Sequence, residues 1–338
     1  MNPFRSVRRP SESPFSLLAP GGSFIQSLYI RLRLLTRTKA VGLAACVAVF
    51  FILTGHRIAS YKMNTMEWVK APINDIQRTC PAPSYKTLAA TEKPKICMTT
   101  LTDAKKGSVV QRFVRWRNFD SLLEMTWPNK QAYVKKHGYY LFDESDSLDP
   151  SRPPSWSKIR AAQRLLKEES CDWVFWLDAD TVIMNSAKTV EAFLPADTQK
   201  DLILTRQKGG SYNAGAWLIR KSDWSLHFLD TWWNMREFVH PPGMSTSGDN
   251  AALKAYLTER MDPAEFKKHI VVPPRCTYNS VTVFVSPAEA ALVTSMQDIE
   301  KQEYYMKVGK YHKGDLIAHV AGKNNKIDTT AILLKDAV

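Results

Sequence analysis

Two aspartates stand one residue apart at the end of a long apolar run, in the stretch CDWVFWLDADTVIMN at residues 171–185. An uninterrupted apolar run of this length predicts a strand in the centre of a sheet that is covered on both faces. On a strand, Asp178 and Asp180 would point to the same side. Adjacent carboxylates repel each other unless a cation lies between them, and a divalent metal is the commonest such cation. The pair is therefore a candidate metal site.

A second set of metal-capable residues lies far along the chain, in DLIAHVAGKNNK at residues 315–326. His319 follows an apolar strand, and Gly322, Lys323 and Lys326 come after it. A lone histidine is usually structural. A histidine followed by a glycine turn and lysines offers a metal ligand, a close backbone approach and a counter-charge for phosphate. This combination argues against a binding domain without chemistry.

Strand and helix patterns alternate from residue 95 onward. The segment NKQAYVKKHGYYLFDE predicts a helix that ends at Gly138 and a strand after it. The segment PSWSKIRAAQRLLKEES predicts a helix with Ser155 or Ser157 as its N-cap. Such alternation implies an α/β fold with a mostly parallel central sheet and helices on both faces. Ligands in these sheets bind outside the carboxyl ends of the strands, where the aspartate pair is expected to lie.

The positive charge of the chain is concentrated at its start. The 338 residues carry a formal net charge of +13, and residues 1–39 hold seven Lys and Arg against one acid, Glu12. Nearly half of the excess therefore lies in this segment, and we expect no nucleic-acid partner. Of all residues, 44% are hydrophobic, which is ample for a large buried core.

An uncharged apolar stretch, AVGLAACVAVFFILTG at residues 40–55, follows the basic cluster directly. A membrane-spanning helix needs about 20 apolar residues and tolerates about 17, so the span must continue to Ala59. We predict a basic cytosolic tail at 1–39, an uncleaved transmembrane signal anchor at 40–59, and a lumenal remainder. A cleaved signal peptide is the alternative, although its apolar region normally lies nearer the terminus.

Residues 60–94 are polar and contain several prolines, which predicts a stem between the membrane and a domain at 95–338. Beyond the predicted span lie four cysteines: Cys80, Cys97, Cys171 and Cys276. An oxidising lumen would permit disulfides among them, but the sequence alone does not pair them.

Two other classes of function fit parts of this pattern. DADTV at 178–182 also matches the motif of aspartate-nucleophile phosphatases, in which the first Asp attacks phosphorus and the second is an acid/base. That fold normally opens with this strand, and SGDN at 247–250 supplies only one further acid. The other class is a non-catalytic, membrane-tethered glycan-binding domain that uses tryptophans such as Trp232 and Trp233. Aromatic residues at helical spacing are more often core.

Several blocks occur in a fixed order: WSKI, WLDADTVIMN, YNAGAWLIRKSDWSLHFLDTWW, GDNAALKAYL and HVAGK. Over residues 95–325 they resemble glycosyltransferase family 34, which includes fungal mannosyl- and galactosyltransferases and plant xyloglucan xylosyltransferases. The resemblance implies a GT-A nucleotide-sugar transferase fold and a type II Golgi membrane enzyme with its catalytic domain in the lumen. It also implies Mn²⁺ (or Mg²⁺), a nucleotide-sugar donor, a glycan acceptor, and retention of the anomeric configuration.

The resemblance also implies roles for matching positions. The metal would be held by Asp178, Asp180 and His319. The donor would be contacted by Asn213 and Gly215 at the sugar and by Gly322 and Lys323 at the diphosphate. Lys158 is a further candidate for the nucleotide, with a solvated helix position as the alternative. Asp249 and Asn250 would lie near the anomeric carbon as catalytic residues.

Asn250 departs from the family pattern, which usually has Asp-Gln where this chain has Asp249-Asn250. Its amide either orients the donor sugar or only caps a helix. Retention without an obvious nucleophile favours front-face attack, and double displacement through Asp249 is the alternative. The residues leave open whether the donor carries mannose, galactose or xylose. A homo- or hetero-oligomer with related transferases is compatible with them.

Overall fold

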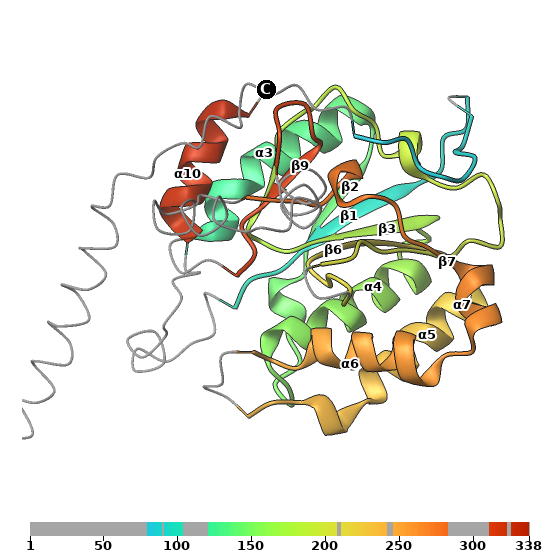
Figure 1. Cartoon of the computed structure of the whole chain (residues 1–338). Coiled ribbons are helices and arrows are strands. Elements are labelled where there is room, and N and C mark those ends of the chain that lie inside the picture. Colours follow the sequence, from blue (N-terminus) through green and yellow to red (C-terminus); the bar gives the residue numbers. More distant parts are fainter. Residues whose placement is uncertain are drawn as a thin grey trace, which may run out of the picture. The chain divides into compact units, whose positions relative to one another are not determined.

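The computed structural model describes residues 80–89, 91–103, 121–207, 211–241, 246–282, 311–322 and 326–337 (Figure 1). The predicted cytosolic tail, the predicted signal anchor, most of the predicted stem, and Lys323 lie outside these residues. Within the described ranges, no helix is both long and apolar enough to cross a membrane.

A six-stranded sheet forms the centre of the domain. Its order is β2 (Tyr140–Asp143), β1 (Ile96–Thr100), β3 (Trp173–Leu177), β6 (Ala216–Arg220), β5 (Leu202–Ile203) and β7 (Ile270–Val271). Strands β2, β1 and β3 are parallel, as are β5 and β7, whereas β6 is antiparallel to both of its neighbours. The sheet is therefore mixed, and β6 is the one strand of these six that runs against the others.

Helices cover both faces of this sheet (Figure 1). On one side lie α4 (Ser157–Lys167), α5 (Asp223–Asn234), α6 (Asp249–Ala255) and α7 (Pro263–His269). On the other side lie α3 (Leu122–His137) and α10 (Lys326–Asp336), which contact each other. Short 3₁₀ turns lie at Ser145–Ser147, Pro154–Trp156, Glu191–Phe193, Arg236–Phe238 and Arg275–Thr277, and α6 continues into a π-helical turn at Tyr256–Arg260.

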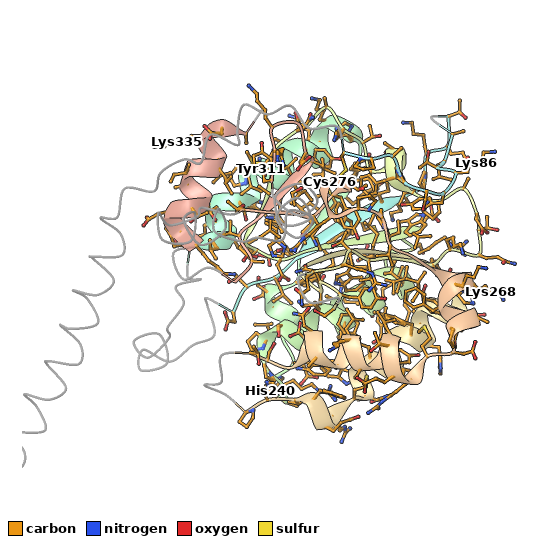
Figure 2. All side chains as sticks on the ribbon, in the orientation of Figure 1. Lys86, His240, Lys268, Cys276, Tyr311 and Lys335 are labelled. Carbon is orange, nitrogen blue, oxygen red and sulfur yellow. A yellow bond between two sulfur atoms is a disulfide. The ribbon has the colours of Figure 1, made fainter. Side chains whose placement is uncertain are left out.

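Strand β3 contributes to the core on both faces, which explains its uninterrupted apolar sequence. Val174 and Trp176 pack in the same cluster as residues of α4 and α5. Phe175 and Leu177 pack on the opposite face with residues of α3. All five residues of β3 are buried. Figure 2 shows side chains filling the space on both sides of the sheet. The prediction of a central, doubly covered strand is confirmed.

A second, three-stranded sheet has the order β4 (Thr181–Ile183), β9 (Ile317–His319), β8 (Ser280–Val281). Strand β9 is antiparallel to β4, with His319 opposite Thr181. The N–H of Val320 also donates to the carbonyl of Asp180 at 3.0 Å. This small sheet therefore joins the segment that follows the aspartate pair to the segment that carries His319.

Of two predicted helix ends, one is confirmed and the other is wrong. Helix α3 ends at Gly138, whose φ of 73° is in the left-handed region, as predicted. The predicted N-cap of α4 is wrong: Trp156 occupies that position, and neither Ser155 nor Ser157 caps the helix. The Ser157 hydroxyl instead accepts a hydrogen bond from the N–H of Asp149 at 3.0 Å.

Two disulfides tie distant segments together, Cys80–Cys276 and Cys97–Cys171. Cys276 is labelled in Figure 2. The first disulfide closes a loop with a sequence separation of 196 residues, and the second closes one of 74 residues. Cys97 belongs to β1, and Cys171 precedes β3. All four cysteines beyond the predicted span are therefore paired.

Candidate active site

Three metal-capable side chains from two distant parts of the chain meet beyond the carboxyl end of β3. One ligand atom from each of Asp178, Asp180 and His319 lies within 4.8 Å of the others. The route by which the two aspartates meet differs from the prediction. The backbone leaves the strand at Asp178 and turns, and the N–H of Thr181 donates to the carbonyl of Asp178 at 3.1 Å. A turn, and not strand alternation, brings the carboxylates together.

The orientation of His319 is set by Asn279. His319 Nδ1 lies 2.9 Å from Asn279 Oδ1, which can only accept, so Nδ1 carries the proton. The amide of Asn279 is itself fixed, because its Nδ2 donates to Thr205 Oγ1 at 2.9 Å and to Asn213 Oδ1 at 3.1 Å. In the neutral imidazole, Nε2 then turns a lone pair toward Asp180 Oδ1 at 3.4 Å. A cation between these two atoms would stabilise that arrangement.

Gly215 forms the wall of this cluster. A Cβ at this position would lie 2.3 Å from His319 Cε1 and 2.9 Å from both His319 Nε2 and Asp178 Oδ2. Such distances leave no room for a side chain. The carbonyl of Gly215 also accepts a hydrogen bond from the N–H of Asp178 at 2.7 Å. The two carboxylates and the imidazole are a donor set that suits Mn²⁺ or Mg²⁺, and the glycine leaves the space beside them clear.

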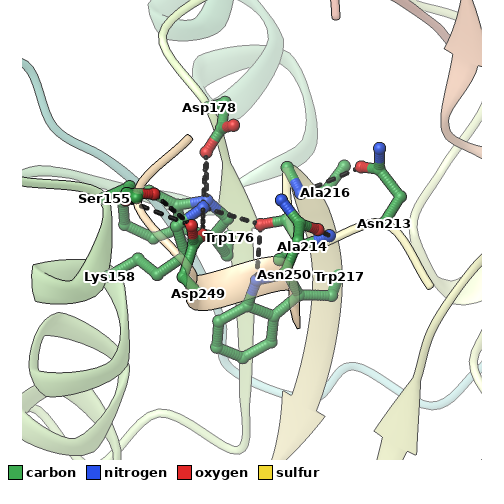
Figure 3. A network of polar contacts seen from close by, with 12 residues as sticks. Ser155, Lys158, Trp176, Asp178, Asn213, Ala214, Ala216, Trp217, Asp249 and Asn250 are labelled. Atoms are coloured by element: carbon green, nitrogen blue, oxygen red, sulfur yellow. Dashed lines mark hydrogen bonds and ion pairs between the residues drawn. The ribbon is translucent and has the colours of Figure 1, made fainter. Parts of the chain in front are cut away.

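A buried lysine links Asp178 to helix α6 (Figure 3). Lys158 Nζ lies 3.2 Å from Asp178 Oδ1 and 3.1 Å from Asp249 Oδ2, and it donates to the carbonyl of Ala214 at 3.0 Å. Lys158 is only 2% exposed, so it is not a solvated helix residue. Burial opposes the charge of its ammonium, but Asp178 and Asp249 outweigh this effect and hold the pKa of Lys158 above its ordinary value. Lys158 is therefore a permanent buried cation.

Asp249 is buried at the first residue of α6. Its Oδ1 accepts hydrogen bonds from the hydroxyls of Ser155, at 3.2 Å, and Ser247, while its Oδ2 faces Lys158. Burial acts to raise the pKa of Asp249, but Lys158 and the serine hydroxyls outweigh it and lower this pKa. Asp249 is therefore an ionised carboxylate with both oxygens engaged inside the protein.

Asn250 is bound to the same turn that carries Gly215 (Figure 3). Its Oδ1 accepts a hydrogen bond from the N–H of Ala214 at 2.9 Å. It does not cap its own helix, because Gly248 is the N-cap residue of α6. Ala214 is thus held at both of its backbone groups. Lys158 binds its carbonyl and Asn250 binds its N–H.

The remaining candidate residues are placed differently from one another. Asn213 is buried, and its Oδ1 accepts from the N–H of Gly215 at 2.9 Å, so it supports the turn from within. Gly322 lies in the turn after β9 with a φ of 70°, in the left-handed region. Lys323 lies outside the described residues. Trp232 and Trp233 are buried in the core, so the interpretation of these two as core residues is confirmed.

The model of the galactosyl transferase GMA12/MNN10 family matches residues 92–206 and 188–329, which together make up more than half of the chain. The chain belongs to this family. It is 28% identical to the probable alpha-1,6-mannosyltransferase MNN10 of Saccharomyces cerevisiae, over 36% of this chain and 39% of that protein. It is 31% identical to galactomannan galactosyltransferase 1 of Cyamopsis tetragonoloba, over 34% of this chain and 28% of that protein. The matched region thus spans less than half the length of these relatives.

Among solved structures, the chain is similar to a glycosyltransferase involved in the glycosylation of the major capsid of PBCV-1, with a TM-score of 0.46 and 16% sequence identity. The similarity covers 72% of this chain and 100% of that chain. Membership of the GMA12/MNN10 family gives no support to the phosphatase or glycan-binding alternatives.

Two residues that contact the candidate metal ligands, Lys326 and Asn279, are not predicted in that role by the sequence. Lys326 was considered only as a counter-charge for phosphate, yet its Nζ forms an ion pair with Asp180 Oδ2. Burial acts to raise the pKa of Asp180, but the Lys326 ammonium beside it outweighs this effect and holds the pKa well below its ordinary value. Asn279, which orients His319, has no motif around it, and no signal in the sequence could have identified it.

Proposed function

We propose that the protein is a glycosyltransferase that moves a hexosyl or pentosyl unit from a nucleotide-sugar to a hydroxyl of a glycan acceptor. The observation that carries the proposal is the convergence of Asp178, Asp180 and His319 beside Gly215 in a chain of the GMA12/MNN10 family. The position of the cluster beyond the carboxyl end of a strand supports a GT-A nucleotide-sugar transferase fold.

The residues present fit a divalent cation such as Mn²⁺ or Mg²⁺, held by Asp178, Asp180 and His319. When bound, such a cation neutralises charge on the diphosphate of the donor. The protein's own contribution is to prepare the ligands. Lys158 holds Asp178, and Asn279 holds His319 with Nε2 directed to the site. These contacts fix the ligand positions before the donor arrives.

We further propose that the reaction proceeds with retention by front-face attack. The bond between the anomeric carbon and the diphosphate oxygen breaks, and the acceptor oxygen bonds to that carbon on the same face. The acceptor proton passes to the departing diphosphate oxygen. Double displacement through Asp249 is disfavoured because both of its oxygens are engaged, by Lys158 and by two serine hydroxyls. Asp249 instead stabilises the ammonium that holds Asp178.

The donor is proposed to lie along the turn that contains Asn213 and Gly215, with Gly322 and Lys323 toward the diphosphate. Asn250 is proposed to act on the donor sugar through this turn, since its side chain holds the N–H of Ala214. Gly215 borders both the turn and the metal ligands, so the sugar and the diphosphate would meet there.

The catalytic domain is proposed to lie in the Golgi lumen, anchored by residues 40–59 as a type II membrane protein. Two disulfides support an oxidising compartment, where such bonds persist. In intact vesicles, a tag at the N-terminus should be digested by added protease, and a tag after Val338 should be protected. Protection of the N-terminal tag would contradict this topology.

A donor screen tests the proposed activity. The full-length protein, purified in detergent, is incubated with Mn²⁺ and in turn with GDP-mannose, UDP-galactose and UDP-xylose, and the released nucleoside diphosphate is measured. One donor should be turned over, EDTA should abolish turnover, and added Mn²⁺ should restore it. Asp178→Asn and His319→Ala should be folded and inactive. Turnover of a phosphomonoester, or metal-independent glycan binding without turnover of any donor, would contradict the proposal.

A further inference from the structure

Side chains of helix α3 bind the backbone of the segment that carries the aspartate pair. The Thr126 hydroxyl donates to the carbonyl of Ala179 at 2.9 Å, and Lys130 Nζ donates to the carbonyl of Thr181 at 2.7 Å. Asn129 makes two hydrogen bonds to Ile183, accepting from its N–H at 2.8 Å and donating to its carbonyl at 2.9 Å. Three side chains of one helix thus contact alternate residues of the backbone that begins between the two aspartates.

The alternation follows from the position of β4 at the edge of its sheet. The backbone groups of Asp180 and Met184 face β9, where they bond to Val320 and Leu316 at 3.0 Å and 2.8 Å. The carbonyl of Thr181 and both backbone groups of Ile183 point away from β9, toward α3. A buried edge needs partners for these groups, and side chains of α3 supply them in place of another strand.

The contacts are buried and close to the metal ligands. Thr126 and Lys130 are both fully buried. Burial lowers the pKa of Lys130 to about 7, although the carboxylates of Asp180 and Asp178 act to raise it. Thr126 is the more direct of the two, because Ala179 is the residue between the aspartates.

We propose that Thr126 is a positioning residue for the metal site. Its hydroxyl holds the peptide between Asp178 and Asp180, and this fixes the separation and direction of the two carboxylates. The inference rests on the proposed function, since it assumes that the pair binds a divalent cation. It adds a residue from a separate helix, one that acts through the backbone carbonyl of Ala179.

Helix α3 also provides a matched control. The Tyr133 hydroxyl donates to the carbonyl of Lys188 at 2.7 Å, from the same helix to a residue that lies beyond the end of β4. Tyr133→Phe therefore removes the same kind of buried hydrogen bond from the same helix, but away from the aspartate turn. If Thr126 serves stability alone, its loss should resemble the loss of the Tyr133 hydroxyl.

The test measures Mn²⁺ affinity of the full-length protein in detergent, without donor, by the loss of the free Mn²⁺ signal in electron paramagnetic resonance. Thr126→Val keeps the size of the side chain and removes the hydroxyl, and it should weaken Mn²⁺ binding about tenfold or more. Thr126→Ser keeps a hydroxyl at this position. Its Mn²⁺ affinity should lie within about threefold of that of the wild type, a smaller loss than that expected for Thr126→Val. Tyr133→Phe should lower the melting temperature and leave Mn²⁺ affinity unchanged.

Each outcome decides a separate point. If Thr126→Val binds Mn²⁺ as tightly as the wild type, or if Tyr133→Phe weakens binding equally, the positioning role is wrong while the proposed function stands. If the wild-type protein binds neither Mn²⁺ nor Mg²⁺, the metal in the proposed function is wrong and the inference fails with it. If Thr126→Val lowers the folded fraction, we would use Thr126→Ala in the same Mn²⁺-binding comparison. Alanine also removes the hydroxyl, and it puts no methyl group where the hydroxyl was.

Discussion

Asp178 and Asp249 share one buried ammonium, that of Lys158, which lies 3.2 Å from the first carboxylate and 3.1 Å from the second. The first belongs to the candidate metal site and the second begins helix α6. Any displacement of α6 therefore changes the charge balance at Asp178. This arrangement couples the helix that carries Asn250 to the metal ligands without a direct contact between them.

Removal of the shared ammonium should destabilise the protein. Lys158→Met leaves Asp178 and Asp249 without their buried counter-charge, and breaking a buried ion pair in this way costs about 3–5 kcal/mol. Lys158→Met combined with Asp249→Asn should recover part of this loss, because one of the two carboxylates is then neutral. Chemical denaturation of the wild type and the three variants gives the coupling energy. Strict additivity of the two single changes would contradict the shared ammonium.

Substitution of Asn250 should affect turnover more than stability. Asn250→Ala removes the hydrogen bond to the N–H of Ala214, which is worth about 1 kcal/mol, and leaves the turn beside Gly215 less fixed. Asn250→Gln moves the amide by about one carbon–carbon bond, and a misplacement of about 1 Å can cost about a hundredfold in rate. Donor kinetics and melting temperature are measured on both variants. Near-wild-type turnover in Asn250→Ala would remove this residue from the active site.

A side chain at residue 215 should block the metal site. Gly215→Ala places a Cβ 2.3 Å from His319 Cε1 and 2.9 Å from Asp178 Oδ2, so one ligand must move. We expect Mn²⁺ binding and turnover to be lost. Gly138→Ala is the control, because a Cβ at that position would meet open space. The only cost of this substitution is the backbone strain of an alanine at a φ of 73°. If both variants bind Mn²⁺ equally well, the close packing at Gly215 is not part of the site.

Reduction of the disulfides should lower the melting temperature. The loop-closure account gives roughly 4 kcal/mol for a long loop such as that closed by Cys97 and Cys171. Cys97→Ala with Cys171→Ala, and separately Cys80→Ala with Cys276→Ala, should each unfold at lower denaturant concentration than the wild type. Mass spectrometry after alkylation without reduction checks the pairing directly. Four alkylated cysteines beyond residue 79 in the folded wild type would show that the bonds do not form.

Several features followed from local sequence because their causes are local. The apolar side chains at 173–177 can all be buried only if other elements pack on both faces of the strand, and this segment forms the central strand β3. Gly138 ended α3 because a residue without a Cβ adopts a positive φ at little cost. Asp178, Asp180 and His319 were recognised by residue type and order, since the chemistry of a divalent cation restricts the ligands to a few kinds.

The tertiary structure decided the contacts that join distant segments. Four features depend on which segments lie side by side: the burial of Lys158, the orientation of His319 by Asn279, the pairing of the cysteines, and the reversed direction of β6. A periodic pattern reports how often a residue in an element faces the core. It does not identify the charged or amide group that a buried side chain will contact. That contact is set by packing between elements far apart in the chain.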